Sequence, residues 1–228
     1  MTIPDPKPVS ISLPGGPTVS GLLQAAERPR AGLVLAHGAG AGMRHPFMAA
    51  VNRGLAERGV ACLRFQFPYM ERGARRPDAP ESAQAAVRAA VAETARLLPV
   101  LPLFAGGKSY GGRMTSQAQA QAPLPGVRGL VFLGFPLHPP GKPSLERAAH
   151  LPAIRVPMLF LQGTRDDFAA PDLLQPLVKG LGDRATLHLF PDADHSFHVP
   201  ARSGRKDADV LAELLDRTAE WITLQGVG

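Results

Sequence analysis

The stretch that decides the fold is Gly107-Lys108-Ser109-Tyr110-Gly111. It follows an apolar run at residues 100–105 and opens a stretch of helical composition. A turn of this kind, a nucleophile elbow, reverses a strand sharply into a helix and holds its serine at the apex in a strained conformation. A Cβ two positions before or after the serine would collide with the turn, and Gly107 and Gly111 avoid that collision. Ser109 is therefore the candidate nucleophile around which the other motifs are interpreted.

Short β-type runs alternate with longer stretches of helical period, an order typical of a mostly parallel sheet covered by helices on both faces. Two N-terminal segments, 9–13 and 18–24, flank a Pro-Gly-Gly-Pro turn and predict an antiparallel hairpin. Six apolar runs predict the following strands, each buried on both faces: 32–36, 61–65, 103–106, 129–133, 158–162 and 186–190. The fold class is therefore α/β, with about eight strands.

Helices are predicted where apolar residues recur on one face. The sets with this spacing are Phe47, Val51 and Leu55, then Ala83, Val87 and Val91, and finally a stripe within 207–222. The connection at 134–155 contains five prolines and only a short helical piece, so it cannot form a large helical lid. Without any linker or repeat, the chain 1–228 is expected to be a single domain.

Length and cysteine usage limit the class of protein. The chain has 228 residues and one cysteine, Cys62, so no disulfide can form within it. Cys62 lies in the apolar stretch 60–65, which favours a buried structural thiol and a reducing compartment. The N-terminus lacks the basic and apolar regions of a signal peptide, and no run approaches the ~18 residues of a membrane span. We therefore expect a soluble, cytoplasmic protein without membrane association.

The formal net charge of +6 raises the question of a nucleic-acid partner. The basic residues are mostly arginines scattered through the chain, and no recognition motif accompanies them. The densest cluster, Arg72, Arg75 and Arg76, lies in a loop that contains glycine and proline but no interleaved aromatic residues. A solvated loop explains this cluster better than an anionic-substrate patch or a nucleic-acid surface. No nucleic-acid partner is expected.

Ser109 needs two partners further along the chain. A serine hydroxyl is a poor nucleophile until a histidine takes its proton, and the histidine needs a carboxylate to fix its tautomer. Asp166 and Asp167 follow the seventh predicted strand, and His195 follows the eighth. Both positions fall at the carboxyl ends of strands, the edge where open parallel sheets place their sites. The order Ser, Asp, His along the chain is that of α/β-hydrolases.

The negative oxygen of an acyl-transfer intermediate also needs hydrogen-bond donors that are already in place. The stretch His37-Gly38-Ala39-Gly40 follows the third predicted strand, at the position of the first oxyanion loop. We expect the backbone N–H of Ala39 to pair with that of Tyr110, the residue after the nucleophile.

Neighbouring residues compete for these roles. His37 is expected to brace its loop, and Lys108 to lie at the surface or in a salt bridge. His45 is a candidate for the edge of the pocket, and His198 is a rival to His195 as the base. A metal site built from His195, His198 and Asp194 is conceivable but lacks a further ligand cluster. No metal and no cofactor are therefore predicted.

The chain resembles a known family over most of its length from residue 32 onward. The motifs that carry the resemblance are the stretches 37–42, 67–71, 106–113, 134–143, 162–166 and 194–197, with Gly106-Gly107-Lys108-Ser109-Tyr110-Gly111-Gly112-Arg113 at their centre. They resemble the small α/β-hydrolases related to testis-expressed protein 30 and to the hydrolase-like domain of the NSL chromatin-complex subunit, and more distantly dienelactone-hydrolase-like enzymes. The resemblance implies the hydrolase fold and carries the triad onto Ser109, Asp166 and His195. Asp167 is then expected to be a loop carboxylate or a cap for the helix that starts near Pro171.

Two functions fit this sequence. The first is a serine hydrolase that acts on a small-molecule ester or thioester through Ser109, His195 and Asp166, with the Ala39 and Tyr110 amides holding the oxyanion. The second is an interaction module on the same fold, with the arginine loop at 72–76 or the proline-rich segment 134–143 as its contact surface. The intact triad favours the first, because a scaffold has no physical need for those three residues together.

Overall fold

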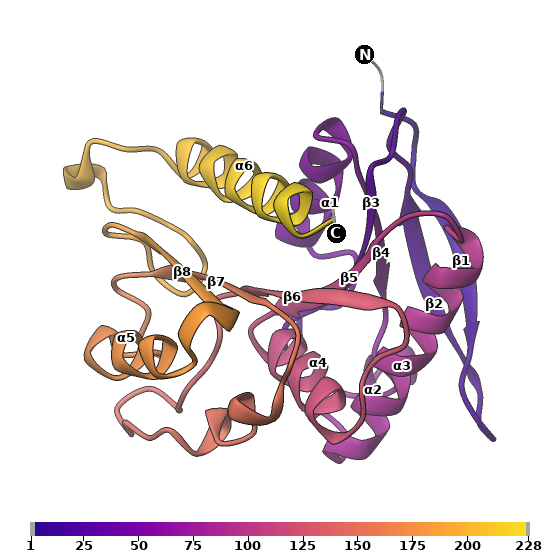
Figure 1. The fold of residues 1–228 in the computed structure, drawn as a ribbon, viewed down its shortest axis with the longest axis horizontal. Coiled ribbons are helices and arrows are strands. Elements are labelled where there is room, and N and C mark those ends of the chain that lie inside the picture. The colour runs from indigo at the N-terminus through magenta and orange to yellow at the C-terminus, as the bar shows by residue number, and fades with distance from the viewer. Residues whose placement is uncertain (1–2, 227–228) are drawn as a thin grey trace.

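The computed structural model describes residues 3–226 and contains one eight-stranded sheet (Figure 1). The strands are β1 Lys7–Ser12, β2 Thr18–Gln24, β3 Ala31–Ala36, β4 Val60–Phe65, β5 Leu103–Lys108, β6 Val127–Leu133, β7 Met158–Gly163 and β8 Ala185–Phe190. Their spatial order is β1-β2-β4-β3-β5-β6-β7-β8. The strands β1 and β2 pair antiparallel, β2 pairs antiparallel with β4, and the remaining pairs are parallel. All eight predicted strands are confirmed, as is the mostly parallel sheet.

Helices cover both faces of this sheet. They are α1 Pro46–Glu57, α2 Pro68–Glu71, α3 Pro80–Leu97, α4 Tyr110–Gln121, α5 Pro171–Gly180 and α6 Asp207–Gly226. Figure 1 shows α1 and α6 on one face, with α3, α4 and α5 on the other. The two hydrophobic cores follow the same division, one lined by α1 and α6 and the other by α3, α4 and α5. No helix within residues 3–226 is long and apolar enough to cross a bilayer.

The predicted inner faces of the helices are buried apart from two half-buried residues, Phe47 of α1 and Leu211 of α6. Val51 and Leu55 of α1 are buried, whereas Phe47 in the first turn is only half-buried. Cys62 is fully buried on β4, and this burial raises the pKa of its thiol, which keeps it protonated and unreactive. Its structural role is therefore as predicted.

The expectation that β8 is buried on both faces is wrong. It is an edge strand that pairs only with β7, and most of its residues are half-buried. An edge strand has a neighbouring strand on one side only, so solvent reaches its side chains more easily than those of a central strand. Between β6 and β7, the described chain forms only two short 3₁₀ turns, Glu146–Ala148 and Leu151–Ala153, and no large lid.

Candidate active site

Ser109 lies at the turn between β5 and α4 with φ 51° and ψ −117°, so the predicted strained elbow is present. The glycines at 107 and 111 are required by the neighbouring strand. A Cβ on Gly107 would lie 2.5 Å from the carbonyl oxygen of Ala36 at the end of β3, and a Cβ on Gly111 would overlap the same oxygen. The elbow packs directly on the backbone of β3, which only glycine allows.

The structure brings Ser109, His195 and Asp166 together. His195 Nε2 lies 2.9 Å from Ser109 Oγ, and His195 Nδ1 lies 2.7 Å from Asp166 Oδ2. The Asp166 side chain is fully buried, while the imidazole is partly exposed. Since a carboxylate only accepts hydrogen bonds, Nδ1 carries the proton and Nε2 is free to accept from the serine hydroxyl.

The Asp166 carboxylate is held by donors from three directions. Its Oδ1 accepts a hydrogen bond from the backbone N–H of Phe168 at 2.8 Å, and its Oδ2 also accepts from Gln162 Nε2. The amide oxygen of Gln162 in turn accepts from the backbone N–H of Phe135 at 2.9 Å. Asp167 is exposed. Ala170 is the N-cap residue of α5, and no side chain caps this helix, so Asp167 is a loop carboxylate and does not cap α5.

The loop that carries His195 is organised by Asp194. Its Oδ1 accepts from the backbone N–H groups of Ser196 at 2.7 Å and His198 at 3.0 Å. The ring of His198 binds Asp207 at the start of α6 instead of approaching Ser109, and this carboxylate raises the pKa of His198. Within residues 3–226 no group of three or more histidine, cysteine or acidic residues is arranged to hold a metal ion.

The two amides proposed for the oxyanion are available. Neither Ala39 nor Tyr110 donates its backbone N–H to another of the described residues. Tyr110 begins α4, where the first N–H groups of a helix have no partner within the helix. Ala39 lines the same cavity as Ser109.

Contacts with the segment after β4 hold the loop that carries Ala39 in place. His37 Nδ1 donates to the Gly38 carbonyl at 2.7 Å, and its Nε2 accepts from the backbone N–H of Phe67 at 3.1 Å. Burial lowers the pKa of His37, which favours the neutral ring that this pattern requires. The Gly40 N–H donates to Tyr69 Oη at 3.0 Å. His37 therefore braces its loop, as predicted, and Tyr69 acts beside it.

The expectation that Lys108 lies at the surface or in a salt bridge is wrong. Its ammonium group is buried, although the residue as a whole is partly exposed, and it donates to the carbonyl oxygen of His195 at 2.6 Å. Burial lowers the pKa of Lys108 to about 8, while the charges of Asp166 and Asp194 act in the opposite direction.

A cavity of about 340 Å³ opens onto Ser109 and His195. Its apolar walls are formed by Ala41, Phe47, Met48 and Phe168. His45 lies at the edge, as predicted, and its Nδ1 accepts the N–H of Phe47 at the start of α1. The half-buried state of Phe47 thus results from its place in the cavity wall.

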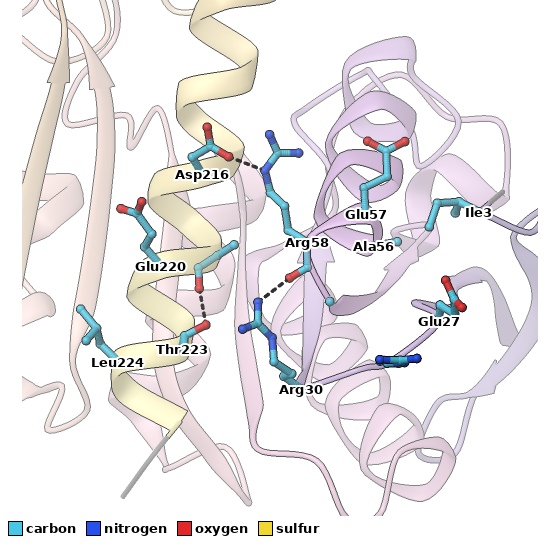
Figure 2. A pocket seen from close by; sticks show the side chains of 13 residues that line it. Ile3, Glu27, Arg30, Ala56, Glu57, Arg58, Asp216, Glu220, Thr223 and Leu224 are labelled. Atoms are coloured by element: carbon cyan, nitrogen blue, oxygen red, sulfur yellow. Dashed lines mark hydrogen bonds and ion pairs between the residues drawn. The ribbon is translucent and has the colours of Figure 1, made fainter. Parts of the chain in front are cut away.

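A larger hollow of about 790 Å³ lies elsewhere, between the end of α1 and the C-terminal half of α6 (Figure 2). Its residues Arg30 and Arg58 stand just before β3 and β4, at the edge of the sheet opposite Ser109. Figure 2 shows Arg58 bound to Asp216, at 2.6 Å, and Arg30 bound to the Arg58 carbonyl, at 2.9 Å. The described residues of its lining include no histidine, cysteine or serine, whereas Ser109 and His195 both line the smaller cavity.

Sequence reasoning did not single out three residues that complete the site: Gln162, Phe168 and Gly134. The signal for Gln162 was a polar residue within a buried strand, which needs a partner. Phe168 packs on the His195 ring with 4.3 Å between ring centroids. Gly134 has φ 69°, and a Cβ there would lie 3.5 Å from both Asp166 Oδ2 and His195 Cε1.

Solved structures share this fold. A serine hydrolase without a lid from Xanthomonas campestris is 20% identical with a TM-score of 0.75, and 97% of each chain is covered. A dienelactone hydrolase from Anabaena variabilis is also 20% identical with a TM-score of 0.75, covering 96% of this chain and 98% of its own. A serine hydrolase homologue from Coxiella burnetii is 17% identical with a TM-score of 0.76, covering 95% and 99%.

These likenesses confirm the broader part of the predicted resemblance, which is the α/β-hydrolase fold with dienelactone-hydrolase-like neighbours. At such identities they show the fold alone. The sequence pattern of the alpha/beta hydrolase domain family matches residues 29–223, nearly the whole described chain. The chain therefore belongs to the alpha/beta hydrolase domain family.

Proposed function

We propose that this protein is a serine hydrolase that cleaves a carboxylic ester or thioester. The observation that carries the proposal is the hydrogen-bonded series from Ser109 Oγ through His195 to the buried Asp166 carboxylate, with distances of 2.9 Å and 2.7 Å. These residues lie beneath a cavity with apolar walls, which suits the binding of an acyl group. Family membership and neighbours described as serine hydrolases support the same reaction class.

The proposed reaction has two halves. Ser109 Oγ attacks the acyl carbon while His195 Nε2 takes its proton, and the resulting imidazolium is stabilised by Asp166. His195 then gives this proton to the departing alcohol or thiol, which leaves the acyl group on Ser109. In the second half, His195 takes a proton from water and the resulting hydroxide attacks the acyl carbon. The bond between the acyl group and Ser109 Oγ then breaks as His195 returns the proton to that oxygen, and the acid is released. The amides of Ala39 and Tyr110 hold the oxyanion in both halves.

A fluorophosphonate probe tests the proposal directly. Such probes form a covalent adduct with an activated serine, so labelling followed by peptide mass spectrometry should place the adduct on Ser109. The rival function, an interaction module on the same fold, predicts no labelling. An adduct on another serine would contradict the assignment of the nucleophile.

Short and medium acyl chains should be the better substrates. The cavity is about 340 Å³, and the chain between β6 and β7 adds no cap that could enclose a longer acyl group. Each methylene gains about 0.8 kcal/mol only where an apolar wall receives it. In a series of p-nitrophenyl esters, kcat/KM should therefore level off, and a value still rising beyond about ten carbons would contradict this reading.

Tyr69→Phe tests the proposed oxyanion loop. The variant removes the acceptor of the Gly40 N–H, so the loop that carries the Ala39 amide becomes less well held. We expect kcat to fall about tenfold with KM nearly unchanged, less than for losing an oxyanion donor itself.

Tyr110→Phe provides a matched control, because it keeps the backbone N–H of residue 110 and removes only a buried hydroxyl that has no hydrogen-bond partner among the described residues. This control should leave kcat within about threefold of the wild-type value. Equal effects from the two substitutions would argue against the role of Tyr69.

The narrower predictions also remain part of this proposal. The motifs at 106–113 and 134–143 support a relationship to the group around testis-expressed protein 30 and the NSL subunit. A reducing, cytoplasmic location is supported by the single buried Cys62. The arginine loop at 72–76 is exposed, and Arg72 pairs with Asp78 at 2.6 Å, which fits a solvated loop without a nucleic-acid partner.

A further inference from the structure

The side chain of Lys108 connects the elbow to the loop that carries His195. Its stem passes Gly38, where an added Cβ would lie 3.7 Å from Lys108 Cγ. Its ammonium group donates to the His195 carbonyl at 2.6 Å and lies 5.6 Å from the centre of the Phe197 ring. The residue just before the nucleophile thus binds the backbone of the base.

The Lys108 ammonium group, Asp166 and His195 all lie close to Gly134. A Cβ on Gly134 would lie 3.0 Å from Lys108 Nζ and 3.5 Å from Asp166 Oδ2 and His195 Cε1. Lys108 Nζ therefore lies close to Gly134, at the end of β6, and to the backbone of the loop after β8. With φ 69°, a side chain at position 134 would be strained and would crowd the Lys108 ammonium group.

A lysine at this position is costly. Removing an ammonium group from water is unfavourable unless it is paired and hydrogen-bonded. Here the counter-charges come from Asp166 and Asp194, and the ion pairs described in the structure include no direct contact between Lys108 and either carboxylate. An apolar side chain of similar length would fill the same space at lower cost, so a buried charge here points to a role in the reaction.

We propose that Lys108 is a positioning residue of the hydrolase reaction, whose ammonium group holds the His195 loop against the elbow and so sets His195 Nε2 opposite Ser109 Oγ. This inference rests on the proposed function. Asp194 organises the His195 loop through its backbone N–H groups, and Lys108 holds the same loop through the carbonyl of His195. The imidazole is thereby fixed from its backbone as well as through Asp166.

The charge on Lys108 should make the reaction depend on pH. The charged and titratable groups that face Lys108 are Asp166 after β7, and Asp194 and His195 after β8. As the pH rises through about 8, Lys108 loses its proton, and a neutral amine binds the carbonyl less strongly and no longer balances the two carboxylates. We expect kcat to decline above that pH.

The test compares Lys108→Met, Lys108→Arg and Lys142→Met in p-nitrophenyl ester hydrolysis from pH 6 to 10. Lys108→Met should lower kcat about 10- to 100-fold and change KM less than about threefold. In Lys108→Arg the charge persists at all these pH values, so activity should be partly restored and the decline above pH 8 should be absent. Lys142 is exposed, and its loss should change neither constant.

Two results would overturn the inference. One is a Lys108→Met variant with the wild-type kcat and pH profile. The other is a kcat of the wild-type protein that shows no decline between pH 7 and 10. This measurement does not use the variants, so it remains informative even if they do not fold. Fluorophosphonate labelling of the wild-type protein separates this inference from the proposed function. If Ser109 is not labelled, the proposed hydrolase activity is refuted. If Ser109 is labelled but Lys108→Met keeps the wild-type kcat, only the role of Lys108 is refuted.

Discussion

Ser109→Ala should lower ester hydrolysis by roughly 10⁴- to 10⁶-fold, because the variant has no group that can form the acyl-enzyme. The residual activity of the variant would come from substrate binding and from the oxyanion amides alone. Alanine carries the same Cβ as serine, so the elbow with φ 51° keeps its backbone strain and its packing on β3. The measurement is kcat/KM on a short p-nitrophenyl ester, together with the thermal midpoint of unfolding, which should be nearly unchanged.

Ser196→Ala is the matched control for this experiment. Ser196 lines the same cavity and follows His195 directly, but its hydroxyl makes no hydrogen bond to a described residue. Its substitution should change kcat/KM by less than about threefold. Undiminished activity in Ser109→Ala would refute the proposed nucleophile, and equal losses in the two variants would indicate damage to the cavity instead of the chemistry.

Asp166→Asn should cost on the order of 10⁴ in kcat near neutral pH while preserving the fold. The asparagine amide can present a donor to His195 Nδ1, which then becomes an acceptor and leaves the proton on Nε2, facing the serine. In that tautomer His195 cannot take the Ser109 proton. The Phe168 N–H that binds Asp166 Oδ1 keeps an acceptor if the asparagine oxygen occupies that position, so the loop should remain folded. The asparagine NH2 would then face the Gln162 amide donor, so the variant should be less stable than the wild type.

Asp167→Asn is the neighbouring control, since Asp167 is an exposed loop carboxylate one position along the chain. It should cost less than about tenfold in kcat. Because both substitutions remove one negative charge, their difference isolates the contact with His195 at 2.7 Å. If the two variants showed the reverse order, the orienting role would pass to Asp167, and the hydrolase proposal would still stand.

The strands and the elbow are predictable from the sequence because their signals are local. Runs such as residues 103–106 are short and lack polar side chains, which distinguishes central parallel strands from helices. The glycines at 107 and 111 indicate a tight turn around Ser109 that leaves no space for a Cβ at either position. Asp166 and His195 could be found in the same way, because each follows a predicted strand, and parallel strands bring their carboxyl ends to one edge of the sheet.

The exposure of β8 and the role of Lys108 were not predictable in this way. An edge strand and a central strand can share an apolar pattern, and only the sheet order shows that β8 lacks a second neighbour. Lys108 adjoins Ser109 in sequence, but the carbonyl that it binds belongs to a residue 87 positions away. The local pattern suggests a surface lysine, since most lysines are exposed.

The sequence by itself determined the fold class, the elbow at Ser109 and the candidate partners Asp166 and His195, because short-range periodicity and backbone sterics encode all of them. Only the tertiary structure decided which side chains wall the cavity, and that the Lys108 ammonium group is buried and bound to the carbonyl of His195. The physical reason is that burial, hydrogen-bond partners and pKa depend on segments distant in sequence that pack around a group, and no local pattern contains them.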